Sequence, residues 1–109
     1  MSQWHTICKP EDIPLNCGRA ALLANCQVAV FRVLVDEQER FYAIDNHDPF
    51  SGANVLSRGI VGNCGDILVV ASPVYKQHFC LRTGKCLEDN VHLRTWPVRL
   101  QGEHLQLAA

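Results

Sequence analysis

The chain consists of short apolar segments, rich in β-branched and aromatic residues, that are separated by clusters of Gly, Pro, Asn and Asp. Such segments are typical of β-strands, and the clusters between them are typical of turns. The segments cover residues 4–9, 18–24, 27–35, 40–46, 66–72, 78–82 and 96–107. No helical pattern long enough to connect parallel strands lies between them, which argues against an α/β fold. We therefore predict an all-β antiparallel sandwich or small barrel of about seven or eight short strands.

The turn-forming residues predict how these strands connect. Residues 18–24 and 27–35 are expected to form a hairpin across Asn25–Cys26, and the acidic turn at residues 36–39 leads into the next strand. Within the segment 27–35, residues 27–33 are apolar on both faces, which is typical of a central strand. The last hairpin is predicted around Gln101–Gly102.

Residues 46–65 break the strand pattern, because Gly, Asn, Ser and a Pro are concentrated there. We interpret this stretch as a long loop. Long loops in compact domains are usually functional or are inherited from a functional site.

Size and charge limit the classes of function. A chain of 109 residues, 48% hydrophobic and 19% charged, fits one globular domain covering residues 1–109. A net charge of −1 predicts no nucleic-acid partner and no anionic membrane surface. The N-terminal residues lack the pattern of a secretory signal, and no apolar run reaches a bilayer span. We expect a soluble, cytoplasmic protein.

The six cysteines do not form a recognisable metal or disulfide pattern, because the sequence contains no C-x-x-C pair. In a reducing compartment we interpret them as free thiols in or near the core. Cys80, between Phe79 and Leu81, has the neighbours of a small buried residue.

Two segments carry motifs of one known family. Residues 46–59 and 72–84 resemble the two cluster-binding loops of the Rieske iron–sulfur domain, in order and in frame. The first segment keeps the proline, glycine and leucine of its motif, and the second keeps a proline, an aromatic residue and a Thr-Gly turn. The matching residues are Pro49, Gly52, Leu56, Gly59, Pro73, Phe79, Thr83 and Gly84. The resemblance implies a Rieske-like fold with two loops at the cluster positions.

The ligand positions of that motif are all changed. A Rieske cluster is held by two thiolates and two imidazoles. The matching positions are Asp48 and Ser72 for the thiolates, and Phe50 and Tyr75 for the imidazoles. Phe50 has no donor atom, and oxygen in place of sulfur removes the soft ligands that such clusters select. We therefore predict vestigial cluster positions, with no metal ligand, no cofactor-binding residue and no catalytic residue in this chain.

The sequence allows two other kinds of site as alternatives. A mononuclear iron site with two histidines and one carboxylate can be drawn from His47, Asp48 and His78. A nucleophilic Cys–His pair can be drawn from Cys80 and His78, although buried thiols are usually inert.

The loops themselves are candidate contact surfaces. In Rieske domains the loop tips face an electron-transfer partner, so their aromatic and proline side chains here suit protein contact. The residues expected at this surface are His47, Asp48, Pro49, Phe50, Pro73 and Tyr75. Phe50 and Tyr75 could instead fill the vacated cluster site, and we expect at least one of the two rings to do so.

Within the Rieske-like proteins, the chain is most similar to the small-subunit family of NADH-dependent nitrite reductases. Length, the opening "MSQW", and the stretches "DPF", "VLSRG" and "ASP" carry this resemblance. It implies a cofactor-free accessory subunit of a cytoplasmic enzyme that reduces nitrite to ammonium in nitrate assimilation, inactive by itself. The implied partner is a large subunit with FAD, a [4Fe–4S] cluster, siroheme and a site for NADH. A stand-alone Rieske-like protein-binding module and an unconventional electron carrier remain the alternatives.

Overall fold

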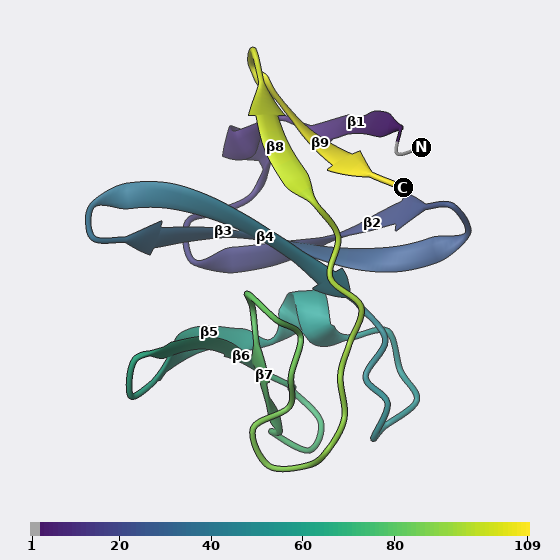
Figure 1. Ribbon diagram of the computed structural model, residues 1–109, viewed down its shortest axis with the longest axis vertical. Helices are drawn as coiled ribbons and strands as arrows, with labels where there is room; N and C mark the ends of the chain where they lie inside the picture. Colours follow the sequence, from purple (N-terminus) through teal and green to yellow (C-terminus); the bar gives the residue numbers. More distant parts are fainter. Residues whose placement is uncertain (1–2) are drawn as a thin grey trace.

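The computed structural model describes residues 3–109 as three antiparallel sheets of three strands each, and the predicted all-β fold is confirmed (Figure 1). The strands are β1 (Trp4–Cys8), β2 (Cys17–Leu23), β3 (Cys26–Val35), β4 (Gln38–Asp45), β5 (Ile60–Cys64), β6 (Ile67–Ala71), β7 (His78–Cys80), β8 (Val98–Gln101) and β9 (His104–Ala108). Two single 3-10 turns, Pro10–Asp12 and Leu56–Arg58, accompany them. In the described part of the chain, no helix has the length and apolar character needed to cross a membrane. Met1 and Ser2 of the predicted domain lie outside the described residues.

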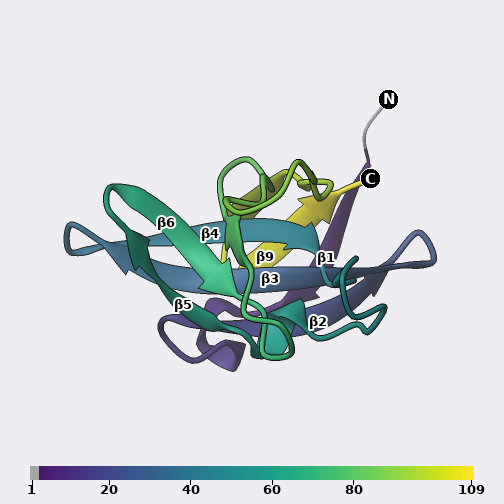
Figure 2. The ribbon, with the colours of Figure 1, turned by 90° about the horizontal axis from the view of Figure 1, so that it is seen from below.

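The sheets are stacked and do not close into a barrel. The sheet β2-β3-β4 lies between β1-β9-β8 on one side and β5-β6-β7 on the other (Figures 1 and 2). Of the two architectures predicted from the sequence, the structure is therefore the layered one.

Strand β3 supports both layers because its two faces are apolar, as the sequence predicts for a central strand. Ala29, Phe31 and Val33 point into the core shared with β5-β6-β7. Val28 and Val30 point into the core shared with β1-β9-β8. Each face of β3 buries apolar surface against a different neighbouring sheet. This burial is the main contribution to the stability of the three stacked sheets.

The first hairpin turns one residue earlier than the sequence predicts. Its central residues are Ala24 and Asn25, with φ of 50° and 62°, and Leu23 pairs with Cys26. A two-residue turn with positive φ at both positions matches the twist of the flanking strands, so Cys26 belongs to β3. The acidic turn is likewise shorter than predicted: only residues 36–37 turn, and β4 already begins at Gln38.

The prediction of a continuous loop over residues 46–65 is wrong for its second half. Ile60–Cys64 forms β5, which pairs with β6 from Ile60↔Ala71 to Cys64↔Ile67. Gly65, with φ of 60°, makes the tight turn between the two strands. The apolar pair Ile60–Val61 is followed by Gly62 and Asn63, which are typical of turns, so the sequence did not indicate a strand here.

The segment after β7 returns to the middle sheet and covers the far end of β4. The backbone N–H of Asp45 donates to the carbonyl of Arg94 at 3.0 Å, and the N–H of Trp96 donates to the carbonyl of Ala43 at 2.9 Å. The Trp96 indole N–H donates to the Asp45 carboxylate at 3.0 Å. These bonds anchor the crossover that brings the chain back to β8.

Candidate functional site

The first cluster-type loop, residues 47–54, is closed by its own backbone. The N–H of Asp48 donates to the carbonyl of Ala53 at 2.8 Å, and the N–H of Gly52 donates to the carbonyl of Asp48 at 2.8 Å. The Asp48 carboxylate accepts the N–H of Phe50 at 2.9 Å. An Asx turn of this kind satisfies backbone donors locally and holds the loop in one conformation.

The second loop, residues 72–77, repeats the same pattern. The N–H of Ser72 donates to the carbonyl of Gln77 at 2.9 Å, and the N–H of Lys76 donates to the carbonyl of Ser72 at 3.1 Å. The Ser72 hydroxyl accepts the N–H of Val74 at 3.3 Å. The two loops are therefore equivalent in backbone bonding, with Asp48 and Ser72 at corresponding positions.

These two corresponding residues bind each other. The Ser72 hydroxyl donates to the Asp48 carboxylate at 2.5 Å, and both side chains are buried. Burial opposes ionisation of Asp48, but the hydrogen bonds from Ser72 and from the backbone of Phe50 and Ser51 outweigh it and lower the pKa of Asp48. An ionised carboxylate thus joins the two loops at the positions predicted to have lost the thiolates.

The two aromatic residues at the imidazole positions have different environments. Phe50 is half-buried, packs against the core between the sheets, and its ring centroid lies 6.2 Å from that of Phe79. Tyr75 is 61% exposed. We expected at least one ring to fill the cluster site, and Phe50 does pack inward, whereas Tyr75 faces solvent.

The loop tips present a surface that is partly apolar. Pro73 and Tyr75 are exposed as expected, and Val74 between them is 45% exposed. Ile60 is 77% exposed and pairs with Ala71, directly before the second loop. Val74 and Ile60 could not be predicted from the sequence, because residues 60–64 do not read as a strand and a valine in a loop carries no signal by itself.

In the first loop, His47 and Pro49 are exposed, whereas Asp48 is buried and cannot belong to the surface. The His47 ring nitrogen Nδ1 lies 3.1 Å from the Asn54 side-chain oxygen. Of the six residues expected at the tips, four are exposed, Phe50 is half-buried and Asp48 is internal.

The side chains at the four ligand positions do not fit a [2Fe–2S] cluster. The oxygens of Asp48 and Ser72 are engaged with each other, Phe50 offers no donor atom, and Tyr75 is a solvent-exposed phenol. Such a cluster requires thiolates on one iron and imidazoles on the other. Among residues 3–109, no three His, Cys, Asp or Glu side chains are grouped as metal ligands.

His78, which both of the other candidate sites require, is paired with the Glu88 carboxylate. The His78 ring nitrogen Nδ1 lies 2.6 Å from one oxygen of that carboxylate, and the other oxygen accepts the His78 backbone N–H at 2.8 Å. Asp48 and His47 have the partners described above. The drawn iron site is therefore not assembled, and His78 is oriented toward Glu88.

The cysteines are free thiols throughout residues 3–109, and their burial varies. Cys80 and Cys86 are buried, which confirms the prediction for Cys80, but Cys17 is exposed. Burial raises the pKa of the Cys80 thiol, but hydrogen bonds from Thr83 and Arg82 outweigh it and lower that pKa.

Three stacked antiparallel sheets with two equivalent loops joined at one end define the class of this protein, which is a Rieske-like domain. The family model described as the Rieske-like [2Fe-2S] domain matches residues 3–108. The small subunit of nitrite reductase (NADH) from Escherichia coli K12 is 48% identical over 89 residues, covering 82% of this chain and 81% of the relative. The chain therefore belongs to the small-subunit family of NADH-dependent nitrite reductases, an oxidoreductase family.

Two further comparisons agree with this family assignment. The NMR structure of the Escherichia coli protein NirD has a TM-score of 0.90 and 41% identity, covering 100% of this chain and 98% of that one. The nitrite reductase [NAD(P)H] large subunit of Klebsiella oxytoca is 41% identical over 99 residues, which are 90% of this chain and 10% of that protein. The chain thus spans about a tenth of this large relative.

Proposed function

We propose that this chain is the cofactor-free small subunit of a cytoplasmic NADH-dependent nitrite reductase, and that it acts by binding and supporting a large subunit. The observation that carries the proposal is the Asp48–Ser72 hydrogen bond, in which a carboxylate and a hydroxyl satisfy each other where a Rieske cluster has its thiolates. The two loops are held together without iron, so a metal is not needed to order them.

The loop tips are the proposed contact surface. Pro73, Val74 and Tyr75 form an exposed, partly apolar group, and Ile60 extends it along β5. Large exposed apolar and aromatic side chains are typical of the buried centre of an interface. The hydrogen bonds within each loop hold this group in place before binding, which lowers the entropic cost of association.

The chemistry is assigned to the partner. We propose that the large subunit carries the FAD, the [4Fe–4S] cluster and the siroheme, takes electrons from NADH and reduces nitrite to ammonium in nitrate assimilation. A relative in Klebsiella oxytoca contains a segment similar to nearly the whole of this chain within a large subunit, which supports direct association. By itself, this chain is expected to have no reductase activity.

The test is co-purification of the tagged chain from nitrite-grown cells, followed by an absorption spectrum of the eluate. Flavin and siroheme bands on a large co-purifying protein support the proposal if the chain alone is colourless. Tyr75→Ala should weaken this capture. Leu22 on β2 is an apolar residue that is even more exposed than Tyr75, and Leu22→Ala should leave the capture unchanged.

Other outcomes select the alternatives. A colourless chain that captures no coloured partner would indicate a stand-alone protein-binding module. An isolated chain with iron and visible absorption would indicate an electron carrier and would refute the cofactor-free assignment.

A further inference from the structure

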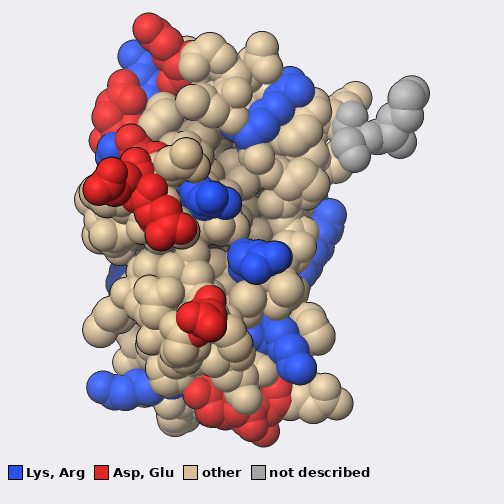
Figure 3. Space-filling model, turned by 60° about the vertical axis from the view of Figure 1, so that its left-hand side comes forward, with Lys and Arg blue, Asp and Glu red and all other residues tan. Residues whose placement is uncertain are grey.

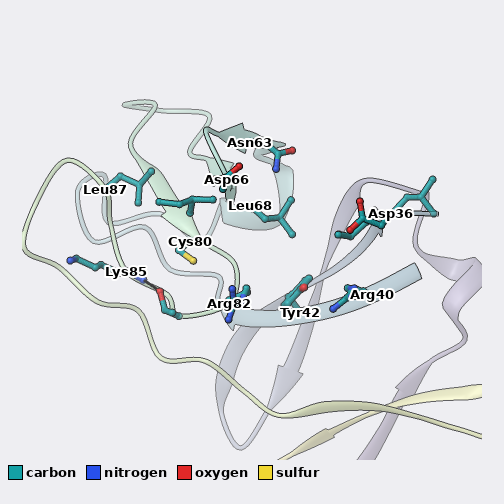
Figure 4. Close-up of a pocket in the computed structure, with 14 residues that line it drawn as sticks. Asp36, Arg40, Tyr42, Asn63, Asp66, Leu68, Cys80, Arg82, Lys85 and Leu87 are labelled. Atoms are coloured by element: carbon teal, nitrogen blue, oxygen red, sulfur yellow. Dashed lines mark hydrogen bonds between the residues drawn. The ribbon is translucent and has the colours of Figure 1, made fainter. Parts of the chain in front are cut away.

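A second surface lies away from the loops at residues 47–54 and 72–77. It is found at the beginning of strands β4 and β6, whose other ends lead into those loops. It is an open groove of about 930 Å³ between the beginning of β4 and the β5–β6 hairpin (Figure 4). Arg40 and Tyr42 from β4 line one side, and Ile67 and Leu68 from β6 line another. The β3–β4 and β5–β6 hairpins, whose residues line the groove, lie on the left of Figure 1.

The groove contains more positive than negative charge. Lys85, Arg82 and Arg40 follow one another along one side, with Asp66 and Asp36 across from them (Figure 4). The ion pairs of the described residues are Arg32–Glu39 and His78–Glu88, so none of the three cations is paired with these carboxylates. Figure 3 shows the two charge signs interspersed over this side of the molecule. Three unpaired cations in one groove favour an anionic ligand.

Apolar side chains border the same groove. Leu34 is 45% exposed, Ile67 42% and Leu87 36%. A simple inorganic anion gains nothing from such residues, whereas a polypeptide with acidic and apolar side chains contacts both kinds. The mixed lining therefore favours a peptide segment over a small anion.

An unpaired strand edge lies next to the groove. The carbonyl of Ala43 and the N–H of Asp45 point outward from β4 and are bonded to the segment at Arg94 and Trp96. Because outward-pointing residues alternate along an antiparallel edge strand, Phe41 also directs its backbone groups outward. Within residues 3–109, Phe41 makes no backbone hydrogen bond on that side. The first half of β4 is therefore free to pair with another strand.

We propose that this groove binds an extended acidic segment of a partner protein, which adds as a strand to the edge of β4 at Glu39 and Phe41. Alternate side chains of an added strand lie on the same face as Arg40 and Tyr42, and hence over the groove. Acidic side chains at those positions meet Arg40, Arg82 and Lys85. The proposal concerns a surface separate from the loop tips and is independent of the function proposed above.

The experiment uses the full chain and a short fluorescein-labelled peptide that alternates Glu with Val, with a Lys–Val peptide as the probe control. Fluorescence anisotropy should detect binding of the Glu–Val peptide only, and added salt should weaken it. Lys85→Glu and Arg82→Glu should each raise the dissociation constant about tenfold. Arg58→Glu, the same change at an exposed arginine outside the groove, should not.

Amide NMR spectra of the labelled chain identify the mode of binding. Shifts and slowed hydrogen exchange at Glu39 and Phe41 are expected on addition of the Glu–Val peptide. The proposal is overturned if the Glu–Val peptide does not bind, or if Lys85→Glu and Arg58→Glu lose equal affinity for it. It is also overturned if the amide chemical-shift changes are confined to residues 47–54 and 72–77. It is also overturned if inorganic phosphate displaces the peptide and reproduces its shifts, because the groove would then be a small-anion site.

Discussion

The hydroxyl of Ser72 donates to the carboxylate of Asp48 at 2.5 Å, and this buried bond joins two loops that are separated by the whole of β5 and β6. Each of the two residues also accepts a backbone N–H within its own loop, from Phe50 and from Val74. The bond therefore connects two small hydrogen-bonded units into one, and its removal should destabilise both loops.

Replacement of Ser72 by alanine should destabilise the fold. The change leaves a buried carboxylate oxygen without its donor, which costs about 1–3 kcal/mol in the free energy of unfolding. Urea denaturation of Ser72→Ala measures this cost, and Ser57→Ala is the control. Ser57 is a partly buried serine in the 3-10 turn after the first loop, and its bond to Asn46 is made by its backbone N–H and not by its hydroxyl. Ser57→Ala should change stability by less than about 0.5 kcal/mol. Equal losses in the two variants would contradict the assignment.

Stability should fall in acid in a manner that depends on Asp48. Its pKa is lowered in the folded state, mainly because hydrogen bonds from Ser72 and Phe50 exceed the opposing effect of burial. The unfolded chain therefore binds a proton at Asp48 more tightly than the folded protein does. The stabilisation from Asp48 is present above the ordinary carboxyl pKa of about 4. It is lost as the pH falls through the lower, folded pKa.

Urea denaturation across the acid range tests this linkage. In Asp48→Asn the slope of unfolding free energy against pH should be shallower than in the parent protein. Some slope should remain, because the pKa of Glu88 is also lowered, chiefly by the hydrogen bond from the His78 backbone. An unchanged slope in Asp48→Asn would show that folding does not lower the pKa of Asp48.

Phe50 and Tyr75, at the positions that match the Rieske imidazoles, should contribute to different properties: Phe50 to stability and Tyr75 to binding. Phe50→Ala removes a ring packed on Phe79 and should cost about 2–3 kcal/mol in unfolding free energy. Tyr75→Ala removes an exposed ring and should alter stability by less than about 0.5 kcal/mol. Thermal denaturation of both variants, combined with the capture experiment, gives the comparison. A stable Phe50→Ala protein would show that the ring is not part of the core.

Two glycines with similar backbone angles should respond differently to alanine. Gly52 (φ 75°) has open space around an added Cβ, whereas a Cβ at Gly84 (φ 80°) would lie 2.2 Å from the carbonyl oxygen of Leu93. Gly52→Ala should cost about 1 kcal/mol, from the left-handed conformation alone. Gly84→Ala adds a clash with backbone and should cost about 3 kcal/mol or more. Chemical denaturation measures both, and similar values would argue against a close contact at Leu93.

Several local features were predictable from the sequence because they depend on neighbouring residues. The two apolar faces of residues 27–33 indicate a strand that is buried on both sides, and β3 is that strand. The spacing of Pro49, Gly52 and Leu56, with Pro73 and Phe79, indicated the Rieske-like loops. The missing thiolates and imidazoles are also a property of residue identity alone.

Other features depend on which residues the fold brings together. Strand β5 forms because residues 60–64 pair with β6, although Gly62 and Asn63 are typical of turns. The hairpin at Ala24 and Asn25 is set by pairing register, which a turn motif does not determine.

Residue types at short spacings are enough to specify the class of fold, the frame of the two loops and the absence of Rieske ligands at the matching positions. The folded arrangement is needed to establish that Asp48 pairs with Ser72, that Phe50 packs inward while Tyr75 stays in solvent, and that Arg40, Arg82 and Lys85 share a groove. These contacts join residues far apart along the chain, and only the stacking of the sheets brings such residues together.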